Sequence, residues 1–296
     1  MKRLLTPLLA SLILSGSASA QTMPETPSVI DSFAQTQFNM ASGNYHEVIA
    51  PGPEATQFKF KLKGYVLGLR MIRADYYGYT DNGRYALYSN ARTSGLAAFL
   101  KQMRIWGVTQ GRYDASGMRP DFQVQQNVNK KNRRIEMEYD NVAKRVNVIA
   151  NPRIGSQGVP PASEDERYAA DDVLSVILKL LMTGQAIDGE PCTGKAPVFD
   201  NKQHYNLRME NTGIIRFKKD GFKGDVLTCN IYYEPVNGFD PEDLPSEEEA
   251  QTPVKIYLSF NEEYGVYVPI RATYKISGFK AVLKMSEFEI TGPKIQ

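Results

Sequence analysis

Few side chains in this 296-residue sequence are suited to acid–base or nucleophilic chemistry. A serine hydrolase needs a histidine base beside its nucleophile, often on a G-x-S-x-G turn. The sequence has no such pentapeptide, and its only histidines are His46 and His204. Asp171 and Asp172 form a tempting carboxylate pair, because two carboxylates can hydrolyse a glycosidic bond. Their place at the start of a predicted helix explains them as capping residues, so we expect no catalytic residues and no enzyme.

Motifs for cofactors and metals are also missing. The zinc-protease pattern H-E-x-x-H, the phosphate-binding G-x-x-x-x-G-K-[ST] and the dinucleotide-binding G-x-G-x-x-G do not occur. The acidic segment from Asp240 to Glu249 lacks the D-x-D-x-D-G spacing of a calcium loop, and we interpret it as a solvated, mobile loop. The sequence therefore predicts neither a cofactor nor a metal site.

The two cysteines, Cys192 and Cys229, suit a structural disulfide. An even cysteine count in an exported chain favours a bridge. This bridge would enclose 36 residues and stabilise the fold by about 4 kcal/mol on the chain-entropy model. Two buried free thiols and a catalytic thiol are the alternatives. A zinc site is not expected, because the cysteines and the two distant histidines lack ligand spacing.

The charge balance argues against nucleic acid as a partner. The chain has 35 lysines and arginines against 33 acidic residues. Removal of the first 20 residues, which the next paragraph predicts, takes away Lys2 and Arg3 and leaves 33 residues of each sign. Proteins that bind nucleic acid usually carry a basic excess, because contacts to phosphate dominate the affinity. The basic run at 130–134 lies between two strand patterns and is interpreted as the charged tip of a hairpin.

The first 20 residues have the three parts of a secretory signal peptide. Lys2 and Arg3 precede an apolar run from Leu4 to Leu14, and small residues end at Ala20, after which we expect cleavage. A membrane anchor is the alternative, but the run is shorter than the roughly 20 residues that span a bilayer. No later segment reaches that length, so we predict an exported, periplasmic protein without a transmembrane segment. Residues 21–55 are polar and contain prolines, and they indicate a flexible leader with a short helix near 33–40.

Alternating apolar and polar residues dominate the chain from residue 56 onward. The run 58–71 changes phase at Gly64, which predicts one long strand bent at a β-bulge. Asp81-Asn82-Gly83 then predicts a hairpin turn. The same alternation recurs near 135–148, 205–209, 227–233, 254–260, 266–276 and 279–285. We therefore predict one β-rich domain over 56–296, mostly antiparallel, as a large curved sheet or partly open barrel with one or two covering helices.

Two segments depart from the strand pattern. Residues 171–182 carry an apolar stripe at helical spacing, with Asp171 or Asp172 as N-cap and Gly184 after the C-terminus. A second, shorter helix is expected over 94–103, with its leucines, Phe99 and Met103 facing inward. The polar stretches 151–170 and 238–252 are interpreted as long loops.

One face of the predicted sheet is rich in aromatic and methionine side chains, which either pack against the helices or line a concave apolar pocket. Two modest helices leave room for a partly hollow interior under ten or more strands. The candidate ligand-binding residues on this face are Tyr65, Leu67, Met71, Tyr85, Leu87, Met137, Tyr139, Met209 and Tyr233.

Several segments, in the same order, resemble the exported family known as domain of unknown function 3108, in its alphaproteobacterial form. The matching segments, all between about residues 56 and 286, are FKFKLKGYVLGLRM, TSGLAAFLKQM, GMRPDFQV, DDVLSVILKL, PVFDNKQHYNL, TCNIYYEPVNGF and VPIRATYKISGFKAVL. Asn201 stands where the family usually has glycine. The resemblance implies a periplasmic, mostly antiparallel β protein with paired cysteines and no agreed activity. The pattern further indicates kinship with curved-sheet lipoprotein or lipid carriers.

Three functions remain open from the sequence. The preferred one is a non-enzymatic periplasmic protein whose curved sheet binds an apolar or lipid-like envelope component. The second is a structural protein that contacts other envelope proteins and has a filled core. The third is a hydrolase that uses unrecognised carboxylates.

Overall fold

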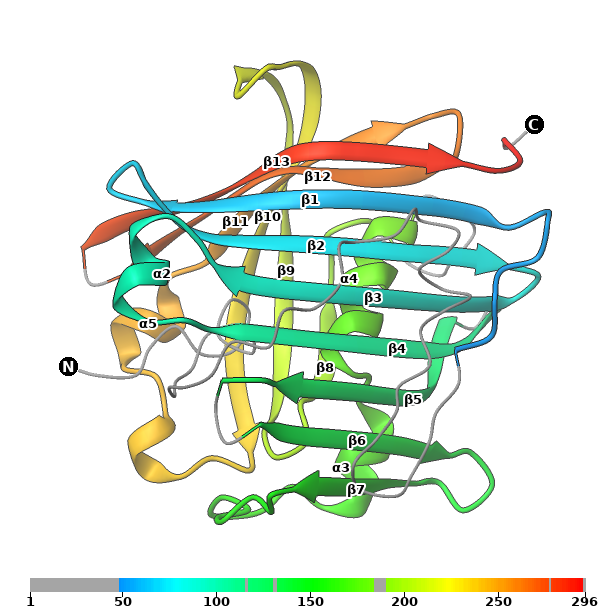
Figure 1. The fold of residues 1–296 in the computed structure, drawn as a ribbon, viewed down its shortest axis with the longest axis vertical. Coiled ribbons are helices and arrows are strands. Elements are labelled where there is room, and N and C mark those ends of the chain that lie inside the picture. The colour runs from blue at the N-terminus through cyan, green and yellow to red at the C-terminus, as the bar shows by residue number, and fades with distance from the viewer. Residues whose placement is uncertain (1–47, 115–116, 130–131, 184–189, 277, 295–296) are drawn as a thin grey trace.

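The described strands form one antiparallel sheet. The computed structural model describes residues 48–114, 117–129, 132–183, 190–276 and 278–294. Its 13 strands are ordered β7-β6-β5-β4-β3-β2-β1-β13-β12-β11-β10-β9-β8 (Figure 1). Strands that follow each other along the chain are neighbours in the sheet, except β7 and β8, which form its two edges. Only the β1–β13 pair joins strands far apart in sequence. The predicted fold class, a large curved antiparallel sheet with few helices, is confirmed.

The strands are β1 (Thr56–Val66), β2 (Leu69–Asp81), β3 (Arg84–Thr93), β4 (Arg104–Asp114), β5 (Gly117–Asn127), β6 (Arg133–Asp140), β7 (Arg145–Asn151), β8 (Lys195–Phe199), β9 (His204–Lys219), β10 (Phe222–Asn237), β11 (Val254–Asn261), β12 (Val266–Ile276) and β13 (Phe279–Thr291). The helical segments are α2 (Leu96–Leu100), α3 (Glu164–Ala169), α4 (Val173–Met182), α5 (Glu247–Gln251) and the single 3₁₀ turn η1 (Pro241–Asp243).

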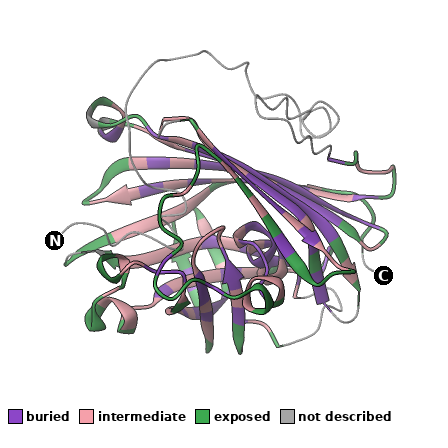
Figure 2. Cartoon of the chain, turned by 90° about the horizontal axis from the view of Figure 1, so that it is seen from below, coloured by how far each residue is buried: buried purple, intermediate pink, exposed green. Residues whose placement is uncertain are grey.

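The sheet bends into two facing halves, and α4 lies between them (Figure 2). The edge strands β7 and β8 do not pair with each other. α3 packs on β7, and Asp171 joins β8: its N–H donates to the Pro197 carbonyl at 3.1 Å, and its own carbonyl accepts from the Phe199 N–H at 2.9 Å. The segment from α3 to α4 thus connects the two edges, which makes the fold barrel-like.

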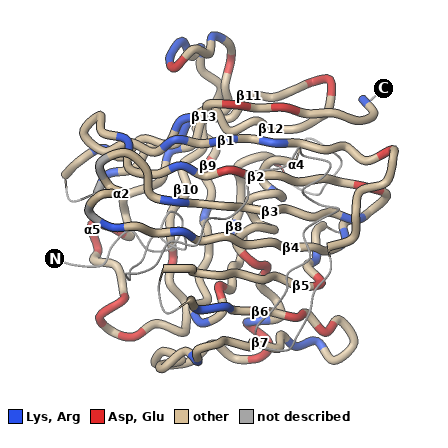
Figure 3. The backbone as a smooth tube through the Cα atoms, in the orientation of Figure 1, with Lys and Arg blue, Asp and Glu red and all other residues tan. Residues whose placement is uncertain are grey.

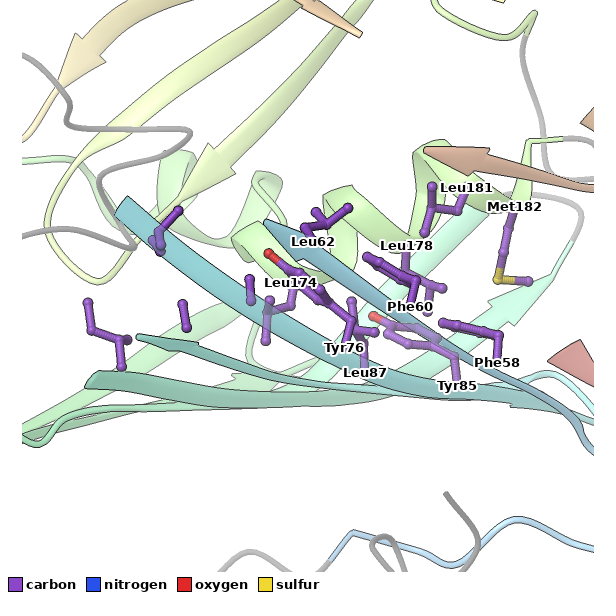
Figure 4. Packing of buried hydrophobic residues seen from close by; sticks show 14 of the residues in the cluster. Phe58, Phe60, Leu62, Tyr76, Tyr85, Leu87, Leu174, Leu178, Leu181 and Met182 are labelled. Atoms are coloured by element: carbon purple, nitrogen blue, oxygen red, sulfur yellow. The ribbon is translucent and has the colours of Figure 1, made fainter. Parts of the chain in front are cut away.

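α4 buries two apolar faces. One face packs on the concave side of β1–β4, where aromatic rings meet leucines of the helix (Figure 4). The residues of this contact include Phe58, Phe60, Tyr76, Tyr85, Leu174, Leu178, Leu181 and Met182. Val176, on another face, packs with β8–β11. Burial of one such side chain stabilises the fold by about 1.5–3 kcal/mol. Since α4 buries apolar side chains against both halves of the sheet, it holds the two halves together.

The convex side of β2–β5 is also buried, in part by the end of the predicted leader. Val48 is 4 % exposed and packs with Trp106 and other residues of this side. The Ile49 N–H donates to the Gln110 side chain at 2.7 Å, and the Tyr79 hydroxyl donates to the Ile49 carbonyl. Residues 48–55 are therefore fixed against the sheet, in contrast to the flexible leader predicted for 21–55.

The predicted single bent strand over 58–71 is wrong. β1 ends at Val66 and β2 begins at Leu69, and the two pair as a hairpin. Leu67 and Gly68 form its turn with φ of 52° and 78°. The predicted bulge at Gly64 does exist as a shift of the β1–β2 register. A leucine rarely adopts positive φ, so the residue types hid this turn.

The structure confirms the turn at Asn82-Gly83, where φ is 46° and 76°, and the helix over 171–182 with Asp172 as its N-cap. The second helix is shorter than predicted: α2 covers five residues, and Phe99 is 91 % exposed instead of facing inward. Met103 is buried as expected.

Both predicted long loops contain helices. α3 lies in 151–170 and begins with a capping box between Ser163 and Glu166. α5 lies in 238–252 and has the same arrangement between Ser246 and Glu249. A serine that precedes a glutamate by three residues fixes the first helical turn, because each side chain bonds to the other residue's backbone N–H.

Some predictions fall outside the described residues: the signal peptide, the helix near 33–40, His46, Gly184 and Lys130-Lys131. Of the basic run at 130–134, the described part follows β5, and Arg134 is buried in β6, where it pairs with Glu136 at 3.0 Å. No helix within the described ranges is long and apolar enough to cross a membrane.

Candidate apolar binding site

A cavity of about 430 Å³ lies between α4 and the half of the sheet that contains β9–β12. Apolar side chains dominate its wall and come from α4, β1 and β8–β13. They include Val176, Ile177, Leu180, Leu181, Phe60, Leu62, Leu207, Ile231, Ile256 and Leu258. Pockets that bind small molecules usually measure about 300–1,000 Å³ and are mostly apolar. This cavity, called the larger cavity below, meets both criteria.

A second cavity of about 180 Å³ adjoins the first. Val254, Ala272 and Leu283 line both cavities. The smaller one extends along β1, β2, β12 and β13 toward Tyr65 and Met71. The two cavities are therefore neighbours that share part of their wall.

Charged and polar side chains lie where the larger cavity meets solvent. Glu190, Thr193 and Lys195 are exposed and line it. Lys195 pairs with Glu234 at 2.7 Å, and Arg271, which also lines the cavity, pairs with Asp220. The site therefore has an apolar interior and a charged rim, which suits an amphipathic molecule.

A disulfide fixes this rim. Cys192 and Cys229 are paired, with their Cα atoms 5.6 Å apart, and both side chains are buried. The predicted pairing is confirmed, and it ties the segment before β8 to β10 at the wall of the larger cavity.

The same segment, residues 189–195, reads G-x-x-x-x-G-K. Ala196 follows instead of the hydroxyl residue of a phosphate-binding loop, and the segment leads into a strand instead of a helix. The context that such a loop requires is therefore missing.

The nine predicted ligand-binding residues separate into three groups. Tyr65 and Met71 line the smaller cavity, and Met209 lines the larger one. Leu67 lies at the β1–β2 turn with 68 % of its surface exposed and lines neither cavity. The other five pack inside the fold without lining either cavity: Tyr85, Leu87, Met137, Tyr139 and Tyr233.

Sequence reasoning missed most of the wall. Leu180, Ile256 and Leu283 were recognisable as inward-facing residues of a helix and two strands. Nothing in their spacing distinguishes a residue that faces an empty space from one that faces a packed neighbour. The aromatic content that selected Tyr85 and Tyr139 marks well-packed parts of the interior.

The carboxylate of Asp172 is fully occupied in holding α4. Asp172 is inaccessible to solvent, and its carboxylate accepts from the Leu174 and Ser175 N–H groups at 2.9 and 3.1 Å. It also accepts from the Ser175 and Thr109 hydroxyls at 2.5 and 2.8 Å. The Tyr85 hydroxyl extends this network to Ser175 at 2.8 Å.

Asp171 is also buried, and it packs beside β8. Burial, and next the nearby charge of Asp172, raise the pKa of Asp171 to about 6. Neither aspartate lines the two cavities. His204, the other candidate for proton transfer, lies 4.0 Å from Glu166, and burial lowers its pKa. The geometry explains Asp172 as a structural group, whereas the buried Oδ1 of Asp171 has no hydrogen-bond partner among the described residues. The expectation of no enzymatic activity remains a prediction.

These features define a class of protein: a barrel-like antiparallel sheet that encloses one helix and an apolar space. The family model described as "Protein of unknown function (DUF3108)" matches residues 60–284, and the chain belongs to this family, as its sequence motifs predict. No curated protein matches the sequence. Among solved structures, a β-barrel-like protein of domain of unknown function DUF1849 from Brucella abortus is similar, with a TM-score of 0.43 and 12 % identity over 82 % of this chain and 100 % of its own.

Proposed function

We propose that this protein is a periplasmic, non-enzymatic carrier that holds an apolar or lipid-like component of the cell envelope under its curved sheet. The observation that carries the proposal is the 430 Å³ cavity with an apolar wall and a charged rim. The adjoining smaller cavity, which Tyr65 and Met71 line, suits an acyl chain, and the charged rim of the larger cavity suits a polar headgroup.

The size of the cavity supports an occupant on energetic grounds. Side chains around an empty space lose packing contacts, so a dry and empty space of this size inside the sheet would lower stability. Folded proteins are stable by only about 5–15 kcal/mol in total. A bound apolar molecule, or water at the open rim, would offset this cost, and an apolar wall favours the apolar molecule.

The proposed location depends on the first 20 residues and on the disulfide, which persists in oxidising compartments. Fractionation of cells that produce the protein, followed by mass measurement of the intact chain, tests it. We expect a periplasmic chain that begins at Gln21, and an unprocessed cytoplasmic chain would contradict this part of the proposal.

A native mass spectrum of the gently purified protein, compared with a spectrum under denaturing conditions, tests the ligand. We expect one extra mass that disappears on denaturation and is recovered by extraction into organic solvent. Absence of a bound mass, together with no uptake of the neutral fluorophore N-phenyl-1-naphthylamine, would contradict the proposal. It would favour a structural protein with a filled interior that contacts other envelope proteins.

A further inference from the structure

The β9–β10 hairpin extends beyond the sheet to which it belongs. Each strand has 16 residues, but β8 pairs only with residues 204–208 of β9, and β11 pairs only with residues 227–231 of β10. The distal part, residues 211–226, has no strand beside it among the described residues. Figure 1 shows it projecting past β13.

One face of this projection is anchored. Phe217 and Val226 are buried and pack with Val268 and Ile270 of β12. The turn is held as well, because Asp220 pairs with Arg271 and with Lys284. The hairpin is thus fixed in position, and its other face remains free for a partner.

The other face is basic. Arg216, Lys218 and Lys223 share it, since β-strand side chains alternate and the register places Lys218 opposite Lys223. Like charges directly opposite each other destabilise a hairpin, so this pair has a cost that folding does not explain. Lys219 adds a fourth cation at the turn, and Figure 3 shows the cluster at the end of the hairpin.

The acidic residues of the hairpin do not neutralise these lysines. Asp225 pairs with Arg216 at 3.0 Å, and Asp220 is shared by two cations outside the hairpin. No carboxylate of the described ranges pairs with Lys218, Lys219 or Lys223.

An apolar side chain accompanies the cations. Ile214 shares the face of Arg216 and Lys218 and is 73 % exposed, whereas its neighbour Ile215 pairs with Val226 on the anchored face. Exposed aliphatic groups next to unpaired lysines fit the boundary of a bilayer, where apolar groups enter the headgroup region and cations meet lipid phosphates.

The basic face continues into the wall of the cavity. Lys223, Asp225 and Leu227 lie on the same side of β10, because these positions differ by two residues along one strand. Beyond the register shift that follows Leu227, Ile231 packs in the same cluster as Leu227. Ile231 lines the larger cavity, and Arg271 at its rim holds the hairpin turn. A surface that met this face would therefore lie on the cavity side of β10.

We propose that the distal β9–β10 hairpin docks the protein on a bilayer surface that contains anionic phospholipid. Ile214 enters the headgroup region, and Lys218 and Lys223 on the same face, with Lys219 at the turn, contact the lipid phosphates. The docking surface is independent of what the cavity holds, so each can be tested without the other.

Co-sedimentation with lipid vesicles tests the docking surface. Protein from the soluble fraction of producing cells is mixed with vesicles of phosphatidylcholine, with or without phosphatidylglycerol. The variant Lys218→Gln/Lys219→Gln/Lys223→Gln is compared with a control that removes three exposed lysines elsewhere, Lys101→Gln/Lys144→Gln/Lys280→Gln.

We expect the wild-type protein to bind the anionic vesicles more tightly than the neutral ones, and high salt to weaken this binding. One basic residue near an anionic surface contributes about a fivefold factor, so the hairpin variant should bind about a hundredfold more weakly. The control should bind as the wild type does, and Ile214→Ser should bind several-fold more weakly.

Equal binding to neutral and anionic vesicles, or equal loss in the hairpin and control variants, would overturn the proposal. Binding of duplex DNA as tight as binding of the anionic vesicles would also overturn it, since the lysines would then recognise any polyanion. Uptake of N-phenyl-1-naphthylamine by the hairpin variant should match the wild type. Absence of uptake in both the wild type and the hairpin variant would count against the carrier function and not against the docking surface.

Discussion

Replacement of Ala272 by phenylalanine places a large apolar side chain where the two cavities meet. Ala272 lies on β12 between Ile256 and Leu283 and lines both spaces. Because Ala272 lines both cavities, we expect a benzyl side chain at this position to fill part of the space instead of displacing packed neighbours. The variant therefore asks whether the space under the sheet exists in solution.

The expected change is a gain in stability. Filling a cavity usually raises the free energy of unfolding by about 0.5–2 kcal/mol, and burial of a whole phenylalanine sets an upper bound near 3 kcal/mol. For a domain of this size, 1 kcal/mol corresponds to about 2–4 °C in Tm. We expect Ala272→Phe to raise the Tm of lipid-free protein by about 1–8 °C.

Ala91→Phe is the matched control. Ala91 is fully buried in the cluster between α4 and β1–β4 and lines neither cavity. Overpacking of a filled core costs about 1–3 kcal/mol or more, so this variant should melt lower or fail to fold. Thermal unfolding followed by circular dichroism measures the Tm of both variants and of the wild type. Lipid is removed beforehand, because a bound ligand would stabilise the wild type alone.

The same pair of variants reports on binding. Ala272→Phe should weaken uptake of N-phenyl-1-naphthylamine at least tenfold, since the ring occupies the space that the probe requires. A loss of stability in Ala272→Phe as large as in Ala91→Phe would refute the cavity. A gain in stability with unchanged uptake would show that the space exists but does not bind the ligand.

Three further outcomes follow from the structure. Loss of the disulfide in Cys192→Ser/Cys229→Ser should cost about 4 kcal/mol in a denaturant titration, and an unchanged midpoint would contradict the bridge. Burial raises the pKa of Asp171 to about 6, so the folded protein keeps a proton that the unfolded chain releases near pH 4. The contribution of Asp171 to the free energy of unfolding therefore falls as the pH rises from about 4 to 6. Asp171→Asn should therefore stabilise the protein by about 2–3 kcal/mol at pH 7.5 and not at pH 4, and equal effects at both pH values would refute the assignment. Gly158→Ala, at φ +83° with its added Cβ 2.0 Å from the Gly238 carbonyl carbon, should lower Tm by several degrees, whereas Gly155→Ala, with open space around it, should not.

The sequence predicts the parts of this fold that depend on local pattern. The strands from β6 onward follow period-two alternation, and α4 follows from its apolar stripe and the cap at Asp172. The helices α3 and α5 also have a local signal, Ser163 before Glu166 and Ser246 before Glu249, but their polar surroundings favour the interpretation as loops. The positive φ of Leu67 has no such signal, because the pairing of β1 with β2 imposes it.

The candidate site is less predictable for a physical reason. A cavity is a mismatch between the volume that the curved sheet encloses and the volume of the inward side chains, and both depend on the whole fold. Leu283 contacts the packed cluster between α4 and β1 and also lines both cavities. The projection of residues 211–226 depends likewise on where β8 and β11 stop pairing, which no local pattern records.

Electron density inside the sheet of the gently purified protein is the most direct measurement of the central claim. The account predicts continuous, elongated density between Leu180 of α4 and Ile256 of β11 that continues past Ala272 toward Tyr65. A closed interior, with the side chains of α4 in direct contact with those of β11–β13 and no volume left between them, would contradict the proposed carrier function.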